Sequence, residues 1–498
     1  MVVYLGALRN HFAWDDTQII VKSDLVHAWS GLWRAFTVPY WPGDWGGFLY
    51  RPLTVASFAL DWHLGGPGWF HAVNLVWHGA ASVLVALLAA RWVGAGDAAA
   101  EIRAALAAGL VFAVHPVHVE AVANVVGRAE LMAAVFSVLS VYAAVERDSL
   151  GWSAVAWIGG LLSKENAAVV PALVGLAWVL GVGRARPAGR RIVRYVVCWV
   201  MIGAAYGAIR AVVLHPYPQQ FNRAPVFVGL SGWQVRLTAI AALSDFLRLL
   251  LFPLALRVDY SPNERTAVHS VSDPAFLVGA LALLCWGALV VISVRRKRKE
   301  AALGLLWIAA AYAPVANLVF PAGVIMAERT LYLPSVGLCL AIAAWVRRVE
   351  TRVLAPVLAL VVIAGGVRSA LRVPVWRTDE HVMLSILEDS PDSYRGPMSA
   401  GIIYLEEHQP AKAYDALDSA IAIYPFDGRL YLLKAHAAFQ TGRSDQVDSI
   451  LAPVRKTCLP GCGADFYGVE AALARQIGDQ VMADSLEAYK ARKSLKQQ

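Results

Sequence analysis

The stretch Ala275–Lys299, AFLVGALALLCWGALVVISVRRKRK, places twenty uncharged, mostly apolar residues directly before five consecutive basic residues. A helix needs about 20 such residues to cross the roughly 30 Å hydrocarbon core of a membrane. Short loops rich in Lys and Arg stay on the cytoplasmic side. This stretch therefore predicts a membrane-spanning helix that ends in the cytoplasm.

The rest of the chain has the same character. Of its 498 residues, 58% are hydrophobic and only 16% are charged, and the mean hydropathy is +0.53. This composition is typical of a polytopic membrane protein. The net charge of +8 argues little for nucleic-acid binding, because Lys and Arg lie in short clusters between apolar runs. We expect an all-α membrane bundle of about ten or eleven spans, the first one truncated, with these candidates: Phe70–Arg91, Ala104–Val119, Ala129–Glu146, Trp152–Leu162, Ala167–Val182, Ile192–Leu214, Ala275–Val294, Ala301–Val319, Leu331–Val346 and Val353–Ser369.

The basic clusters also predict the orientation of the loops. They are assigned to the cytoplasm, so the chain must cross the membrane an even number of times between residues 184–191 and 295–299. The additional apolar piece Leu237–Leu256 contains Asp245 and Arg248, and we interpret it as a helix at the outer face, or as a re-entrant pair. The same count places the polar loops and everything after Arg372 outside the cytoplasm.

Domain boundaries follow from these assignments. Met1–Leu8 would extend only about 12 Å as a helix, which predicts a remnant of a first span whose remainder lies upstream or has been lost. Residues 9–69 form the first extracytoplasmic loop, 70–372 the membrane domain, 373–393 a linker and 394–498 a helical repeat region.

The repeat region shows a tetratricopeptide pattern. Small, aromatic and helix-ending residues recur about one unit apart, which predicts two to three helix pairs that bury their apolar faces against each other: Gly401, Tyr404, Ala413, Ala420 and Pro425, then Tyr431, Gly442 and Leu451, with Gly478 in a degenerate third unit. Cys458 and Cys462 form either a short disulfide or two free thiols.

Paired acids in the first loop raise the first question of chemistry. Asp15 and Asp16 follow Phe12 and Trp14 just after the short apolar opening. They could serve as a helix N-cap and a solvated neighbour. Alternatively, partial desolvation at the membrane edge would raise the pKa of an acid and make it a better general base.

Other polar residues gather at the predicted outer ends of the spans. His115, His118 and Glu120 match no strong metal-ligand spacing, so we expect hydrogen bonds to sugar or phosphate, or interfacial anchoring, rather than a metal site. Charges at a membrane boundary are costly unless they are paired or functional. Arg128, Lys164 and Arg329 would together form a cationic rim that could neutralise a phosphate leaving group. The remaining candidates for the site are Arg51, Glu130, Glu165, Glu328 and Tyr332.

In combination and order, these motifs resemble a known family. They are Trp14-Asp-Asp-Thr, His115-Pro-Val-His-Val-Glu-Ala-Val122, Gly127-Arg-Ala-Glu-Leu131, Ser163-Lys-Glu165 and Ala327-Glu-Arg-Thr-Leu-Tyr-Leu-Pro334. From about Asn10 to its end, the chain looks like the transmembrane and tetratricopeptide-repeat (TMTC) O-mannosyltransferases of the GT-C glycosyltransferase superfamily.

The resemblance implies a polyprenyl-phosphate sugar donor, typically of mannose, and a Ser or Thr hydroxyl acceptor on an extracytoplasmic protein. It implies that Asp15, or else Asp16, is the general base of an inverting single displacement. The other candidates would then position the donor and its phosphate. The spacing of the histidines predicts no metal site, and the resemblance leaves a metal requirement open.

Two departures and two alternatives accompany this expectation. The repeat array is shorter than in the family, and the Ala/Arg/Gly/Val-rich composition suggests a bacterial inner membrane, so the sugar need not be mannose. A GT-C transferase acting on a lipid-linked or surface glycan is one alternative. A non-catalytic transporter or repeat scaffold is the other, although a transporter would place its charges nearer the membrane mid-plane.

Overall fold

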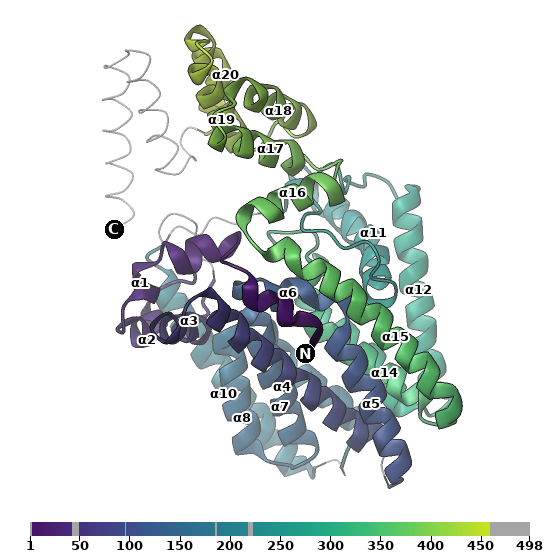
Figure 1. Cartoon of the computed structure of the whole chain (residues 1–498). Coiled ribbons are helices and arrows are strands. Elements are labelled where there is room, and N and C mark those ends of the chain that lie inside the picture. The colour runs from purple at the N-terminus through teal and green to yellow at the C-terminus, as the bar shows by residue number, and fades with distance from the viewer. Residues whose placement is uncertain (1, 42–48, 95, 185–186, 218–222, 459–498) are drawn as a thin grey trace.

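A computed structural model describes residues 2–41, 49–94, 96–184, 187–217 and 223–458, with side chains to residue 454. This part of the chain consists of helices without a β-strand, as the all-α prediction requires. It forms a membrane-type bundle with a small helical array at one end (Figure 1).

Each of the ten predicted spans coincides with a helix. These helices are α4 (Pro67–Val93), α5 (Ala98–Val114), α7 (Arg128–Val145), α8 (Leu150–Ser163), η7 with α9 (Glu165–Val169, Val170–Leu180), α10 (Gly189–Leu214), α12 (Pro274–Arg295), α13 (Lys299–Tyr312), α14 (Tyr332–Val346) and α15 (Thr351–Arg372). Of the helices in the described residues, six are long and apolar enough to span a membrane alone. Ala98–Val114 and Pro116–Ala123, bent by 49° at His115, make a seventh if they count as one span.

The shorter helices stand next to polar interruptions. Both α8 and α13 have 14 residues, or about 21 Å of helix, which is less than the hydrocarbon thickness. Helix α8 ends at Ser163, and the chain turns at Lys164 into η7 and α9. The charged residues Lys164 and Glu165 therefore lie at the break between α8 and α9.

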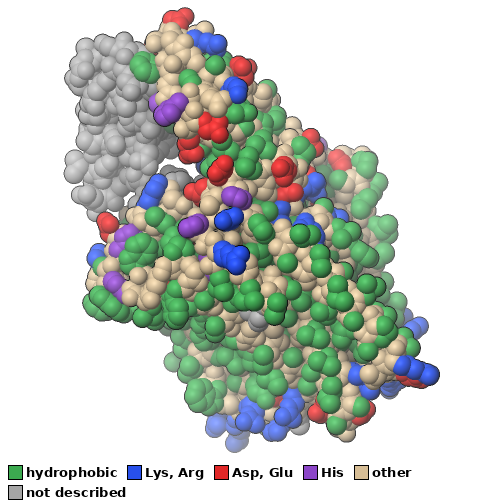
Figure 2. All heavy atoms as spheres, viewed as in Figure 1, with side chains coloured by type: hydrophobic (Ala, Val, Ile, Leu, Met, Phe, Trp, Pro, Cys, Tyr) green, Lys and Arg blue, Asp and Glu red, His purple; other side chains and the backbone are tan. Residues whose placement is uncertain are grey.

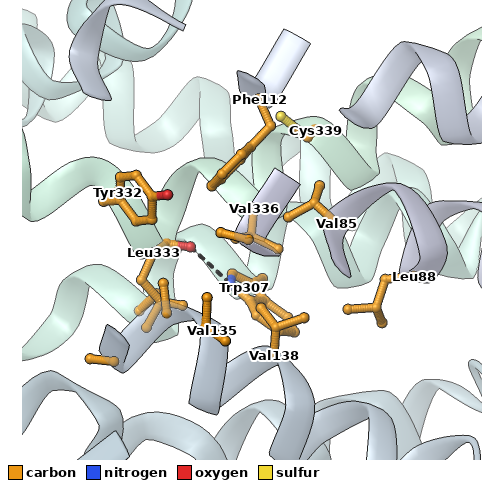
Figure 3. Packing of buried hydrophobic residues seen from close by; sticks show 14 of the residues in the cluster. Val85, Leu88, Phe112, Val135, Val138, Trp307, Tyr332, Leu333, Val336 and Cys339 are labelled. Atoms are coloured by element: carbon orange, nitrogen blue, oxygen red, sulfur yellow. Dashed lines mark hydrogen bonds between the residues drawn. The ribbon is translucent and has the colours of Figure 1, made fainter. Parts of the chain in front are cut away.

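The core lies where α4, α5, α7, α13 and α14 meet. Phe112, Val135, Trp307 and Val336 interdigitate there, and the Trp307 indole Nε1–H donates to the Leu333 carbonyl at 3.1 Å (Figure 3). In contrast, only 6% of the residues in the apolar stretch of α10 are buried, and the same holds for α12, as expected for helices that face lipid.

Two ends of the molecule differ in charge. Lys and Arg gather at the lower end of the bundle in Figure 2, below a broad hydrophobic band, while the repeat helices stand at the opposite end. This distribution agrees with the orientation that the basic loops predict.

The first loop and α11 (Gly232–Leu251) lie toward the repeat end of the bundle (Figure 1). Helix η1 (Val2–Arg9) occupies the segment interpreted as the remnant of a first span. The loop that follows contains η2 (Thr17–Val21), α1 (Asp24–His27), α2 (Gly31–Arg34), η3 (Ala35–Thr37) and α3 (Pro52–Leu64). The predicted outer-face helix is α11, which begins with a capping box formed by Ser231 and Gln234. The remaining short helices are η5 (Pro116–His118), α6 (Val119–Ala123), η6 (Val125–Gly127), η8 (Pro225–Phe227), η9 (Ala313–Val315) and η10 (Glu328–Leu331).

Residues 373–393, interpreted from sequence as a linker, are mostly helical. They form η11 (Val373–Trp376) and α16 (Asp379–Asp389), whose Val382 and Ile386 join the main core. The Asp379 carboxylate accepts hydrogen bonds from the Trp14 backbone and, at 3.2 Å, from the Thr17 hydroxyl. This segment therefore anchors the turn that bears Asp15 and Asp16.

The repeats consist of two helix pairs in the described residues. They are α17 (Arg395–Glu406) with α18 (Pro410–Ile423), and α19 (Gly428–Gln440) with η12 (Ser444–Gln446) and α20 (Val447–Cys458). Ala413, Leu417 and Ala420 are fully buried between them. A Cβ on Gly401 would lie 2.6 Å from Leu417 Cγ, so glycine lets α17 and α18 approach. The degenerate third unit and the Cys458–Cys462 pairing lie outside the described side chains.

Candidate active site

Asp15 and Asp16 occupy different environments. Trp14 adopts a left-handed conformation (φ 59°) and initiates the turn that presents them. Asp16 is fully buried and accepts hydrogen bonds from the backbone N–H groups of Ala13 (3.1 Å), Val125 (3.3 Å) and Val126 (2.8 Å). Asp15 keeps 24% of its side chain exposed and approaches Arg329 Nη2 at 4.0 Å.

The environments shift the acidity of both carboxyl groups. Burial raises the pKa of Asp16 to about 7, although its backbone donors favour the ionised form. Burial also raises the pKa of Asp15, against the opposing charges of Arg329, Arg395 and Arg51. Asp16 is thus a buried anchor between the first loop and η6, and Asp15 is the acid of the pair that keeps exposed surface.

Arg329 is held by two carboxylates. Glu120 accepts from the Arg329 backbone N–H at 2.8 Å and from its Nη1 at 2.7 Å, and Asp15 lies on the Nη2 side. Trp14, Glu120, Tyr260, Arg329 and Arg395 line a pocket of ≈ 80 Å³ beside this group. Two arginines, Arg329 and Arg395, and two acids, Glu120 and Asp259, line this pocket, and Asp15 lies next to Arg329. An arginine that can face an anionic leaving group thus stands beside a partly exposed acid that can accept a proton.

A second set of charges is paired off nearby. Arg51 Nε donates to Glu165 Oε2 at 3.0 Å, and Lys164 forms an ion pair with Glu130. Arg51 also lies 4.8 Å above the Tyr40 ring. These pairs are close enough for electrostatic interaction of Arg51 with Asp15 and of Glu130 with Arg329. They shape the potential of the site while holding α8 and the first loop together.

Arg128 is fully buried and does not line the pocket. Its guanidinium pairs with Asp61 at 2.5 Å, donates to Asn74 Oδ1 at 2.8 Å and to the Phe70 carbonyl at 2.9 Å, and lies over the Phe58 ring. Each of the three guanidinium nitrogens of Arg128 therefore has a partner. Its observed contacts are those of a residue that fixes α3, α4 and α7 relative to one another.

The two histidines and Tyr332 are also satisfied inside the bundle. The ring nitrogens of His118 hydrogen-bond to the Phe112 carbonyl (2.9 Å) and Ser335 Oγ (2.8 Å), and His115 Nε2 hydrogen-bonds to the Leu250 carbonyl at 3.0 Å. The Tyr332 hydroxyl contacts His78 Nδ1 at 2.7 Å. These groups brace the helix ends beneath the pocket.

Glu328 does not line the pocket but binds Tyr260, which does. Its carboxylate accepts from the Tyr260 hydroxyl at 3.0 Å and from the Arg257 backbone N–H at 2.5 Å. Tyr260 lines the pocket. Glu328 therefore positions a pocket residue from beneath.

Comparison with known proteins gives relatives of one kind. The chain is 28% identical over 455 residues to the human protein O-mannosyl-transferase TMTC4, covering 78% of this chain and 61% of that protein. It is 25% identical over 488 residues to human TMTC1, covering 85% and 54%, and 32% identical over 317 residues to fruit-fly Tmtc2, covering 58% and 33%. The chain resembles these O-mannosyl-transferases in sequence. No family model and no solved structure matches it.

The chain spans about three fifths of the length of the curated relatives TMTC4 from human and mouse, 61% of each. The resemblance expected from the motifs is confirmed by these relatives, which share its sequence over most of the chain. Within the residues that the structure describes, the TMTC-like chain has no group of three or more His, Cys, Asp or Glu placed to hold a metal ion.

Sequence reasoning did not single out four residues that build the TMTC-like site. They are Asp61, which neutralises Arg128, Asp379, which holds the Trp14 turn, and the pair Asp259 and Arg395 beside the pocket. Asp259, Asp379 and Arg395 lie in segments that the charge count assigns to the outer side, so their location was available from sequence. Their partners were not, because each contact joins segments far apart in the chain.

Proposed function

We propose that this chain is a membrane glycosyltransferase that moves a sugar, mannose in the first instance, from a polyprenyl-phosphate donor to an extracytoplasmic hydroxyl acceptor on a protein. The relatives supply the O-mannosyl transfer chemistry by name. The observation that carries the proposal for this chain is the contact of a partly exposed Asp15 with Arg329 beside the pocket.

The arrangement suits an inverting single displacement. Asp15 takes the proton of the acceptor hydroxyl, and the hydroxyl oxygen forms a bond to the anomeric carbon. The bond from that carbon to the phosphate oxygen breaks, and the electron pair stays on the phosphate. Arg329 faces the charge that develops on the leaving group, and Glu120 holds the guanidinium in place.

The cellular setting is part of the same proposal. A bacterial inner membrane, with the site and repeats outside the cytoplasm, accords with the composition and with basic residues at the end opposite the repeats. The relatives named above come from animals.

Asp15→Asn tests the base. We expect the variant to insert and purify like the unmodified protein but to lose at least a hundredfold in transfer from radiolabelled polyprenyl-phosphate mannose to membrane extract, since removing a general base costs about 10²–10⁴-fold. Asp24→Asn changes an exposed acid of the same loop and should transfer normally.

The fraction that carries label distinguishes the acceptors. Label on protein, released by alkaline elimination, supports transfer to Ser or Thr. Label confined to glycolipid supports a glycan acceptor. Asp15→Asn with undiminished turnover removes Asp15 from the base role, and absence of label with intact unmodified protein contradicts the transferase proposal.

A further inference from the structure

The wall of the pocket is formed in part by the repeat region. Arg395 is the first residue of α17 and lines the pocket together with Arg329 and Trp14, which come from the membrane domain and the first loop. The repeat region thus contributes the positive charge of Arg395 to the pocket, although Arg395 lies more than sixty residues after Arg329 in the sequence.

The start of α17 is fixed against the loop that contains Asp259. Ser393 Oγ donates to Asp259 Oδ2 at 2.6 Å, and Ser390 Oγ donates to the Asp259 carbonyl at 2.7 Å. The backbones are joined as well, through Tyr394 N–H to the Pro262 carbonyl at 2.7 Å and Asn263 N–H to the Asp392 carbonyl at 2.8 Å. These bonds hold Arg395 at the pocket rather than leaving it on a flexible tether.

The two pocket arginines differ in how fully they are neutralised. Arg329 has Glu120 at 2.7 Å and Asp15 at 4.0 Å. Arg395 Nε lies 3.6 Å from Asp259 Oδ1, and that Nε is buried without a hydrogen-bond partner. Asp259 already accepts from the Ser261 N–H and hydroxyl and from Ser393. The Arg395 guanidinium therefore has one ion pair at 3.6 Å and donates no hydrogen bond to a carboxylate of the described residues, so the part of it that lines the pocket is available to an anion.

We propose that Arg395 binds the phosphate of the polyprenyl-phosphate donor, so that the repeat region completes the active site. This inference rests on the proposed function for the identity of the ligand. The pocket, of ≈ 80 Å³, has room for several waters at about 10–15 Å³ each, and so for a phosphate group. During transfer, Arg395 and Arg329 together face the phosphate as it gains the electron pair of the broken bond.

The test measures phosphate recognition directly. The full chain in lipid nanodiscs is titrated with a short-chain polyprenyl phosphate and, separately, with the corresponding polyprenol, which lacks the phosphate. Arg395→Gln should raise the Kd for the phosphate at least tenfold and leave the Kd for the alcohol unchanged. Arg395→Met, which keeps the apolar stem, should do the same, and Arg395→Lys should restore part of the affinity.

Arg443→Gln serves as the matched control, because Arg443 lies in the repeats over the Tyr414 ring and does not line this pocket. It should bind the phosphate as the unmodified protein does. Equal phosphate affinity in Arg395→Gln and the unmodified protein overturns the inference, and so does an equal loss of phosphate and alcohol binding with a lowered Tm.

The outcomes separate this inference from the proposed function. If Arg395→Gln weakens phosphate binding but the unmodified protein transfers no sugar, the phosphate site stands and the transferase proposal is rejected. If the protein transfers sugar but Arg395→Gln binds the phosphate as tightly as the unmodified protein does, the transferase proposal stands and the role of Arg395 is rejected.

Discussion

Asp15 and Asp16 are neighbours in the chain, yet the fold assigns them to different tasks. Three backbone N–H groups surround the Asp16 carboxylate and leave it no exposed surface. Asp15 retains exposure and an arginine partner at the pocket. Side-chain type alone does not distinguish the two acids, because the difference arises from how the loop packs against η6.

This burial gives Asp16 a measurable signature in stability. The pKa of Asp16 is about 7 in the folded chain against 3.8 for an ordinary carboxyl, so the folded state binds more protons between these values. Its contribution to stability is therefore complete below about pH 4 and is lost as the pH rises through 7. Relative to Asp16→Asn, the unmodified protein should lose several degrees of Tm between pH 5 and pH 8 in the same detergent.

Asp24→Asn provides the baseline for that measurement, because Asp24 is exposed. Its Tm should stay at a constant offset from that of the unmodified protein across the range. The raised pKa of Asp16 would be contradicted if the Tm difference between the unmodified protein and Asp16→Asn did not change with pH. It would also be contradicted if the unmodified protein gained Tm relative to Asp16→Asn as the pH rises.

Residue by residue, the sequence predicted where the polar groups lie better than what they do. Asp15, Glu120 and Arg329 were expected near one another, and the structure brings them into contact. Arg128 was expected to face phosphate, but its guanidinium is enclosed by Asp61, Asn74 and aromatic rings. A charge at the membrane edge must be either paired or functional, and the sequence does not distinguish the two. The fold shows that Arg128 is enclosed by its partners while Arg329 lines the pocket.

At the scale of elements, glycines decide how closely α13 and α14 approach. A Cβ on Gly337 would lie 2.3 Å from the Gly304 carbonyl oxygen, and one on Gly304 would lie 2.5 Å from the Gly337 carbonyl oxygen. Small residues at such crossings let helices pack through their backbones. This crossing supports α14, whose N-terminal side bears Arg329.

Gly337→Ala should therefore push the two helices apart and destabilise the protein by about 1–3 kcal/mol, the usual cost of overpacking a core. Gly175→Ala in α9 is the control, since a Cβ there meets no atom within 4 Å. That change should leave Tm unchanged or raise it, as alanine favours helix by up to about 1 kcal/mol over glycine. Equal Tm values for the two variants would show that the crossing tolerates a methyl group.

Span prediction worked at this scale because hydrophobic runs are a local property of the chain. All ten apolar runs became helices, and the break at Lys164 appears where a charged residue interrupts one run. Residues 373–393 were interpreted as a linker, and most of them are helical. Val382 and Ile386 are buried in the main core, and Asp379 accepts a hydrogen bond from Thr17, so this segment makes contacts between parts of the chain far apart in the sequence.

At the scale of the whole molecule, the charge pattern and the structure point to the same orientation. Glu350 lies in the turn before α15, at the end of the bundle where the basic residues gather, and Glu407 lies in the turn between α17 and α18 of the repeats. Both side chains are exposed. If the repeats and the pocket share the extracytoplasmic side, these two positions lie on opposite sides of the membrane.

Single cysteines at the two positions test this in a background whose five native cysteines are replaced by serine. In intact spheroplasts, a membrane-impermeant maleimide should label Glu407→Cys at once and label Glu350→Cys only after the membrane is permeabilised. Neither substitution removes a basic residue, so the positive-inside signal remains intact. Immediate labelling of Glu350→Cys with protection of Glu407→Cys would invert the topology, and it would place Asp15, Arg329 and Arg395 on the cytoplasmic side, away from an extracytoplasmic acceptor.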